Sequence, residues 1–84
     1  MTKYIYATKN KKSSNFNAPQ FTDYADREAG KAAYIIGCKE SRQYEVEVVK
    51  ELDFYYLGTF DTKTGKFELL DDPDFLFSGS EVFD

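Results

Sequence analysis

The chain has 84 residues, a formal net charge of −4, 18% aromatic residues and no histidine. A chain of this length has room for one hydrophobic core, so residues 1–84 are expected to form a single domain. Without histidine, the Ser–His and Cys–His pairs of nucleophilic catalysis are excluded. We therefore expect a protein that is not an enzyme and uses no cofactor.

The same composition constrains compartment and metal binding. The single cysteine, Cys38, cannot form an internal disulfide, which is typical of a reducing compartment. No apolar run approaches the roughly 18 residues of a membrane span, and the first residues lack the apolar stretch of a secretion signal. The carboxylates of Asp71, Asp72 and Asp74 do not have the spacing of a calcium loop. We expect a cytoplasmic protein without a metal site.

The charges are divided unevenly along the chain. Residues 1–42 carry eight basic and four acidic side chains, a net charge of +4, whereas residues 43–84 carry three basic and eleven acidic ones, a net charge of −8. Such a division predicts a basic surface or arm and an acidic tail. The competing interpretation is a solvated surface without a partner.

The first residues predict a strand followed by a loop. Residues 3–9 alternate aromatic with aliphatic side chains, which is typical of a strand with Tyr4 and Tyr6 on one side. Residues 10–20 are polar and contain Pro19, which disfavours helical geometry at the residue before it. The strand is therefore expected to end in a flexible loop.

A helix is expected next. Thr22 or Asp23 is a suitable N-cap, and Gly37 is a suitable end. Between them, small and apolar residues fall at helical spacing: Ala25, Ala29, Ala32, Ala33 and Ile36. Because that side is built from small residues, we expect the helix to lie close against a sheet.

The second half predicts strands. Residues 44–50 alternate apolar with acidic side chains, the pattern of a strand exposed on one face. Residues 58–68, GTFDTKTGKFE, predict a hairpin, in which Asp61 starts the turn and Gly65 adopts a positive φ.

The end of the chain, DDPDFLFSGSEVFD, is expected to leave the sheet. Pro73 cannot donate to a ladder of hydrogen bonds and should stop the pairing. Residues 71–84 would then form an acidic, aromatic-containing tail.

The order of elements predicts the fold class. A strand, a long loop, a helix and two or three antiparallel strands indicate an α+β fold. We expect a small antiparallel sheet of three to four strands with one helix packed on one face. The other face is left for solvent or for a partner.

A pattern over nearly the whole chain resembles a known family. Its sharpest part is G-x-F-D-x-x-T-G, formed by Gly58, Phe60, Asp61, Thr64 and Gly65. The rest comprises aromatic residues around Pro19, Thr22–Asp23 followed by Arg27 and Ala29, the stretch DFYYL, Pro73, Gly79-x-Glu81 and Phe83. This layout resembles the small non-structural protein of gokushoviruses, a branch of the Microviridae, which are phages with single-stranded DNA genomes.

The resemblance implies a role as well as a source. It implies a non-structural, DNA-binding viral protein in the host cytoplasm that acts during genome replication or packaging. The segment CKESRQYEVEVVKEL departs from the family pattern because it contains neither proline nor histidine.

Single-stranded DNA binding requires cations for the phosphates and ring faces for the bases. The basic half of the chain supplies both. The candidate residues are Lys3, Lys9, Lys11 and Lys12 for phosphate contacts, Tyr4, Tyr6 and Phe16 for stacking, and Arg27 and Lys31 as a second basic patch. The competing interpretation is that the tyrosines fill the core and the lysines solvate a loop. Gly58, Phe60, Asp61 and Gly65 are assigned to the fold.

The acidic tail and the partners complete the hypothesis. We expect the tail to compete electrostatically with DNA for the basic half, while Phe75, Phe77 and Phe83 either recruit partners or pack into the core or a dimer seam. The expected partners are single-stranded DNA, a second copy in a homodimer, and a viral or host replication protein, without a membrane. The alternative is an acidic protein-interaction module or replication regulator that acts through protein contacts without binding DNA.

Overall fold

The structure is a computed structural model and describes residues 1–83, except for the side chains of residues 43 and 44. The elements in chain order are β1 (Thr2–Asn10), β2 (Gln20–Thr22), α1 (Arg27–Lys39), α2 (Gln43–Lys50), β3 (Leu52–Asp61), β4 (Phe67–Ser78) and α3 (Gly79–Val82). Over this range the strands form an antiparallel sheet in the order β2-β1-β3-β4. The predicted α+β class is confirmed.

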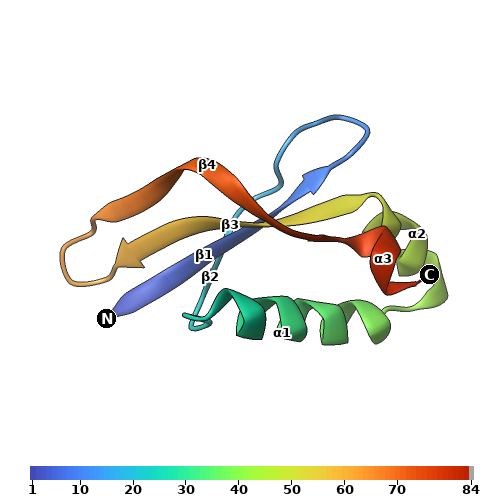
Figure 1. The fold of residues 1–84 in the computed structure, drawn as a ribbon, viewed down its shortest axis with the longest axis horizontal. Helices are drawn as coiled ribbons and strands as arrows, with labels where there is room; N and C mark the ends of the chain where they lie inside the picture. The colour runs from blue at the N-terminus through green and yellow to red at the C-terminus, as the bar shows by residue number, and fades with distance from the viewer. Residues whose placement is uncertain (84) are drawn as a thin grey trace.

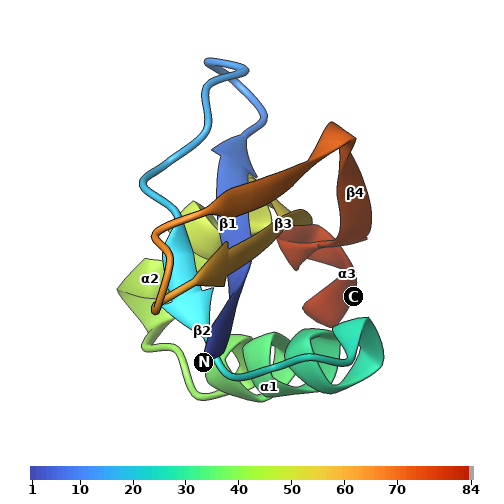
Figure 2. The ribbon, with the colours of Figure 1, turned by 90° about the vertical axis from the view of Figure 1, so that its left-hand side faces the viewer.

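The elements form two layers. Helix α1 runs along one face of the sheet, and α2 and α3 gather at one end of it (Figure 1). Seen end-on, α1 lies on one side of the strands, whereas the loop after β1 and the middle of β4 rise on the other side (Figure 2). The long helix therefore covers one face of the sheet.

A close contact between Gly30 and Tyr6 joins the two layers. A Cβ atom at Gly30 would lie 2.6 Å from the Tyr6 hydroxyl oxygen, which is closer than such atoms pack. The Tyr6 side chain is 1% exposed, and its hydroxyl donates a hydrogen bond of 2.7 Å to the carbonyl oxygen of Tyr24. Its ring also lies 5.2 Å from that of Tyr56 and 5.7 Å from that of Tyr34. The absence of a side chain at Gly30 lets α1 approach the sheet this closely.

The predicted start and end of the helix are wrong. The N-cap is Asp26, whose side chain accepts from the Glu28 amide at 3.1 Å. Thr22 and Asp23 are not available as caps, because Thr22 pairs with β1 and Asp23 accepts from Lys3. Gly37 does not end the helix, since α1 continues to Lys39.

The predicted contact side of the helix is wrong as well. Gly30 and Cys38 are buried, and Tyr34, between them at a spacing of four, packs against the core. Ile36, on the predicted side, is 58% exposed. The expectation of a close approach holds, but a glycine makes it and not the alanines.

The strand predicted for residues 44–50 is wrong, because these residues lie in α2. The Glu45 carboxylate accepts from the Arg42 amide at 3.1 Å, which starts the helix. Val46 and Val49 are half-buried at a helical spacing of three, whereas Val48 is 59% exposed. The alternation of apolar and acidic residues is too short to distinguish a strand from a helical turn.

The predicted hairpin between β3 and β4 is confirmed. The Asp61 carboxylate accepts from the Lys63 amide at 2.8 Å, and this hydrogen bond lowers the pKa of the Asp61 carboxyl. Gly65 has a φ of 74° and donates its amide to the Asp61 carbonyl oxygen at 2.8 Å. Both turn residues act through backbone geometry, as expected.

Pairing does not stop at Pro73, contrary to expectation. Residues 70–73 have no register partner on β3, but β4 resumes pairing where Asp74 faces Tyr56 and Phe75 faces Tyr55. The chain then continues to Ser78 and into α3. Residues 71–83 therefore form part of an edge strand and a helix that packs on the core.

Replacement of Gly30 by alanine tests the contact that joins the layers. We expect Gly30→Ala to lower the free energy of unfolding by about 1–3 kcal/mol, because its methyl group would overlap the buried Tyr6 ring. Gly37→Ala is the matched control. Nothing lies within 4 Å of a Cβ at Gly37, so alanine should stabilise the helix by about 0.5–1 kcal/mol. Urea denaturation of both variants measures the difference, and equal effects would contradict the contact.

Candidate nucleic-acid interface

The two faces of the sheet carry different aromatic residues. Tyr6 and Phe54 lie on the side of α1, where their rings are 5.7 Å and 5.6 Å from that of Tyr34. Successive side chains of a strand point to opposite faces, so Tyr55 points away from α1. Its register partner Phe75 lies on the same face, with the two rings 5.7 Å apart.

The same alternation along β1 places Lys3 and Ile5 on the face opposite α1. Phe60 is the register partner of Lys3, and Phe21 is the partner of Ile5. The Phe21 ring is 5.5 Å from that of Phe60 and 6.2 Å from that of Phe67. We call the aromatic residues on this side the open aromatic face: Phe16, Phe21, Tyr55, Phe60, Phe67 and Phe75.

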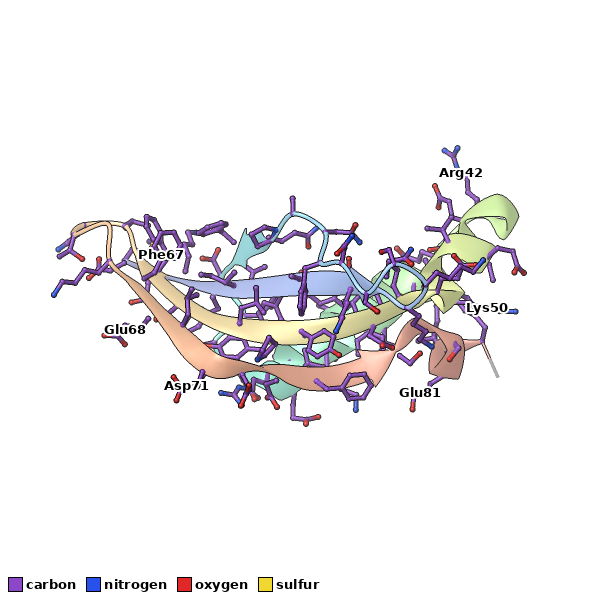
Figure 3. The ribbon with its side chains drawn as sticks, turned by 90° about the horizontal axis from the view of Figure 1, so that it is seen from above. Arg42, Lys50, Phe67, Glu68, Asp71 and Glu81 are labelled. Carbon is purple, nitrogen blue, oxygen red and sulfur yellow. The ribbon has the colours of Figure 1, made fainter. Side chains whose placement is uncertain are left out.

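Four phenylalanines of the open aromatic face present ring surface to solvent. Phe16 is 43% exposed, Phe21 47%, Phe67 55% and Phe75 52%. Figure 3 looks onto this side of the sheet, with α1 behind the strands and Phe67 labelled at the hairpin end. The face thus offers rings at both ends of the sheet.

The loop after β1 positions Phe16 over the sheet. The Asn10 side chain accepts from the amides of Lys12 and Ser13, which turns the chain back on itself. Phe16 then forms an isolated bridge with Lys9, and its ring meets the edge of the Tyr55 ring at 5.2 Å. The Lys9 ammonium lies 5.5 Å from the centre of the Phe16 ring.

The stacking role predicted for Tyr6 is wrong. Tyr6 is buried beneath α1 and presents no ring face to a base. Burial, together with the neighbouring Tyr56 and Tyr34 hydroxyls, raises the pKa of Tyr6 to about 12. Tyr4 is half-buried and points to the same side as Tyr6. Of the three predicted stacking residues, Phe16 is the one on the open aromatic face.

Two of the predicted phosphate contacts are held in short ion pairs. The Lys3 ammonium lies 2.7 Å from a carboxylate oxygen of Asp23, and the Lys12 ammonium lies 2.7 Å from one of Glu51. The hydrogen bond from Lys12 to Glu51 raises the pKa of the Lys12 ammonium. Both cations are thus partnered within the chain.

Lys11 and Arg27 are also partnered. The Lys11 ammonium donates to the Ser78 hydroxyl and lies 3.7 Å from the Asp53 carboxylate. The Arg27 guanidinium lies 2.6 Å from the Asp74 carboxylate and 4.5 Å from the centre of the Tyr56 ring.

The second basic patch does not join the first. Arg27 is committed to Asp74 on the α1 side of the sheet. Lys31 lies beside a hollow of about 380 Å³ between α1 and α3, which is also lined by Ile35, Lys39, Phe77, Glu81 and Val82. These cations lie in the helical layer and Phe16 lies on the other side of the sheet, so the structure does not bring them together.

The oppositely charged halves of the chain form ion pairs with each other in the folded structure. Three ion pairs join a cation of residues 1–42 to a carboxylate of residues 43–84, namely Lys11–Asp53, Lys12–Glu51 and Arg27–Asp74. The basic surface or arm predicted from the charge division is thus largely neutralised within the chain, although Lys9 and Lys31 form no ion pair among residues 1–83. Two of the three carboxylates lie in or just before β3, namely Asp53 and Glu51. The third, Asp74, comes from the predicted tail.

Comparison with known proteins identifies the family. One family model, described as phage ORF5 protein, matches residues 3–82. The chain belongs to the phage ORF5 protein family. No curated protein and no solved structure matches it. In this ORF5-family protein, no helix within residues 1–83 is long and apolar enough to cross a membrane. The same residues contain no group of His, Cys, Asp or Glu side chains arranged to hold a metal ion.

Sequence reasoning missed most of the open aromatic face of this ORF5-family protein. The sequence assigns Phe60 to the fold and gives Phe21 and Phe67 no binding role. Their exposure depends on register: Leu57 and Gly58 form a bulge opposite β1, which brings Phe60 to the same side as Phe21. The one signal in the sequence was the pair of phenylalanines that flanks the hairpin loop.

Removal of the Tyr6 hydroxyl tests its assignment to the core of this ORF5-family protein. The unfolded chain releases the Tyr6 proton near pH 10.0 and the folded chain near pH 12, so the folded state loses stability as the pH rises between these values. Between about pH 9 and pH 11, the free energy of unfolding of the wild type should fall because the unfolded chain ionises Tyr6 more readily. In Tyr6→Phe, which has no hydroxyl at this position, the fall should be smaller by about 1 kcal/mol. Urea denaturation at both pH values measures this, with Tyr4→Phe as control. Equal losses in wild type and Tyr6→Phe would contradict the buried position.

Proposed function

We propose that this phage protein binds single-stranded DNA through the open aromatic face during genome replication or packaging. We further propose that it is a non-structural, non-enzymatic protein of a gokushovirus in the host cytoplasm. The resemblance of the sequence to that branch of the Microviridae supports the source. The exposed rings support the binding mode.

The observation that carries the proposal is the exposure of four phenylalanines on one face of the sheet. With about 200 Å² per aromatic side chain, rings that are roughly half exposed leave about 400 Å² of apolar surface. This surface is divided between two groups of rings, Phe21 with Phe67 near the hairpin and Phe16 with Phe75 around Tyr55. Each base stacked on an aromatic ring contributes about 1–3 kcal/mol to binding. Single strands offer unpaired bases with free π faces, which match this surface.

A second candidate uses the same face for a protein. The overall charge of −4 and the ion-paired cations favour a partner without a phosphate backbone. The roughly 400 Å² of exposed ring surface is close to the apolar share of the roughly 800 Å² that each partner contributes to a standard protein interface. Area therefore does not separate the two candidates, and the nucleic-acid proposal is supported by the match between flat exposed rings and unpaired bases.

Truncation of the exposed rings tests the proposed function. Phe16→Ala and Phe75→Ala should each weaken binding to a labelled single-stranded oligonucleotide by about fivefold or more, because each removes a stacking platform. Fluorescence anisotropy at about 50 mM salt measures the affinity.

Matched controls come from the helices. Ile36→Ala and Val48→Ala remove apolar side chains of similar exposure that lie in α1 and α2, off the open aromatic face. These variants should keep the wild-type affinity. Absence of binding by the wild type, or equal losses in all four variants, would refute the proposal.

A further inference from the structure

We infer that Asp23 and Glu51 make the open aromatic face selective for single strands over duplex DNA, because they hold Lys3 and Lys12 in ion pairs at its two ends. The inference rests on the proposed function and concerns the specificity of the same site.

Lys3 lies at the hairpin end of the open aromatic face. It is the register partner of Phe60 and shares its side of the sheet. Asp23 directly follows β2. Because Thr22 pairs with Tyr4, Asp23 lies next to Lys3, the residue before Tyr4. The carboxylate is 79% exposed and lies 2.7 Å from the Lys3 ammonium. A phosphate that approached Lys3 would have to compete with this carboxylate.

Lys12 lies at the other end, in the loop that carries Phe16. The Lys11 amide donates to the Glu51 carbonyl oxygen at 2.9 Å, which fixes the loop against the start of β3. In this arrangement the Glu51 carboxylate lies 2.7 Å from the Lys12 ammonium, although the Lys12 side chain is 77% exposed. The pair is accessible to solvent, and a phosphate that approached Lys12 would have to compete with the Glu51 carboxylate.

Ion pairing of these lysines has a consequence for specificity. Phosphates are present on duplex and single strands alike, so free cations would attract both. Stacking on an aromatic side chain requires an unpaired base, which duplex DNA does not offer. Lys9, which lies over the Phe16 ring, forms no ion pair among residues 1–83 and leaves the face one available cation. With exposed rings and with Lys3 and Lys12 both ion-paired, the face therefore favours single strands over duplex DNA.

Release of the two lysines tests the inference. The variant D23N/E51Q keeps the shapes of both side chains and removes their charges. We expect duplex affinity to rise by about fivefold or more, and the slope of log K against log salt for duplex to steepen by about 1.8, which corresponds to two new phosphate contacts. Because the single strand already binds by stacking, its affinity should rise less, and the preference for single strands should fall.

The charge-matched control is E68Q/D71N. Glu68 and Asp71 project from the outer edge of β4, away from the other strands (Figure 3). This variant changes the net charge by the same amount but releases neither Lys3 nor Lys12, so it should keep the wild-type preference. Equal changes in the two double variants would show that net charge alone matters and would overturn the inference.

Removal of the cations is the complementary experiment. If Asp23 and Glu51 occupy Lys3 and Lys12, the variant K3M/K12M should keep its single-strand affinity within about twofold and its salt slope within about 0.7. A wild-type protein that binds no oligonucleotide refutes the proposed function itself. A wild-type protein that binds single strands, while D23N/E51Q keeps the same preference, refutes only the inference about specificity.

Discussion

The arrangement of this molecule depends on the contact between Gly30 of α1 and the ring of Tyr6. The sheet has two apolar faces, and the contact commits the long helix to one of them. Tyr34, Phe54 and Phe77 then pack around the same interface. The opposite face keeps its rings in contact with one another but open to solvent. Because α1 lies on one side, the opposite side is covered by no long helix, and Phe16, Phe21, Phe67 and Phe75 stay partly exposed there.

The charges complement this division of the sheet. The cations of the first half and the carboxylates of the second half meet across the fold, so the polarity of the sequence is largely neutralised in three dimensions. The acidic segment around Asp72 and Pro73 lies in an edge strand, where charge and proline oppose pairing with the sheet of another molecule. A binding mode based on stacking follows from this arrangement more naturally than one based on a basic groove.

The sequence was informative where local chemistry decides the conformation. The hairpin around Asp61 and Gly65 and the first strand could be predicted because turn geometry and short alternation specify them. The segment 43–50 could not, since its alternation also fits a helix that buries Val46 and Val49. The site was predicted in part: Phe16 lies on the open aromatic face, whereas Tyr6 is buried. Alternation along β1 places Tyr6 and Ile5 on opposite faces, and both side chains are buried, so alternation alone does not tell which face α1 covers.

The central claim is that single-stranded DNA occupies the face of the sheet opposite α1. Titration of the isotope-labelled protein with an oligonucleotide, followed through its aromatic and methyl NMR signals, tests it most directly. The account predicts ring-current shifts at Phe16, Phe21, Phe67 and Phe75, with unchanged signals at Ile36 and Val48. Shifts confined to α1 around Arg27 and Lys31, with the four phenylalanines unaffected, would contradict it.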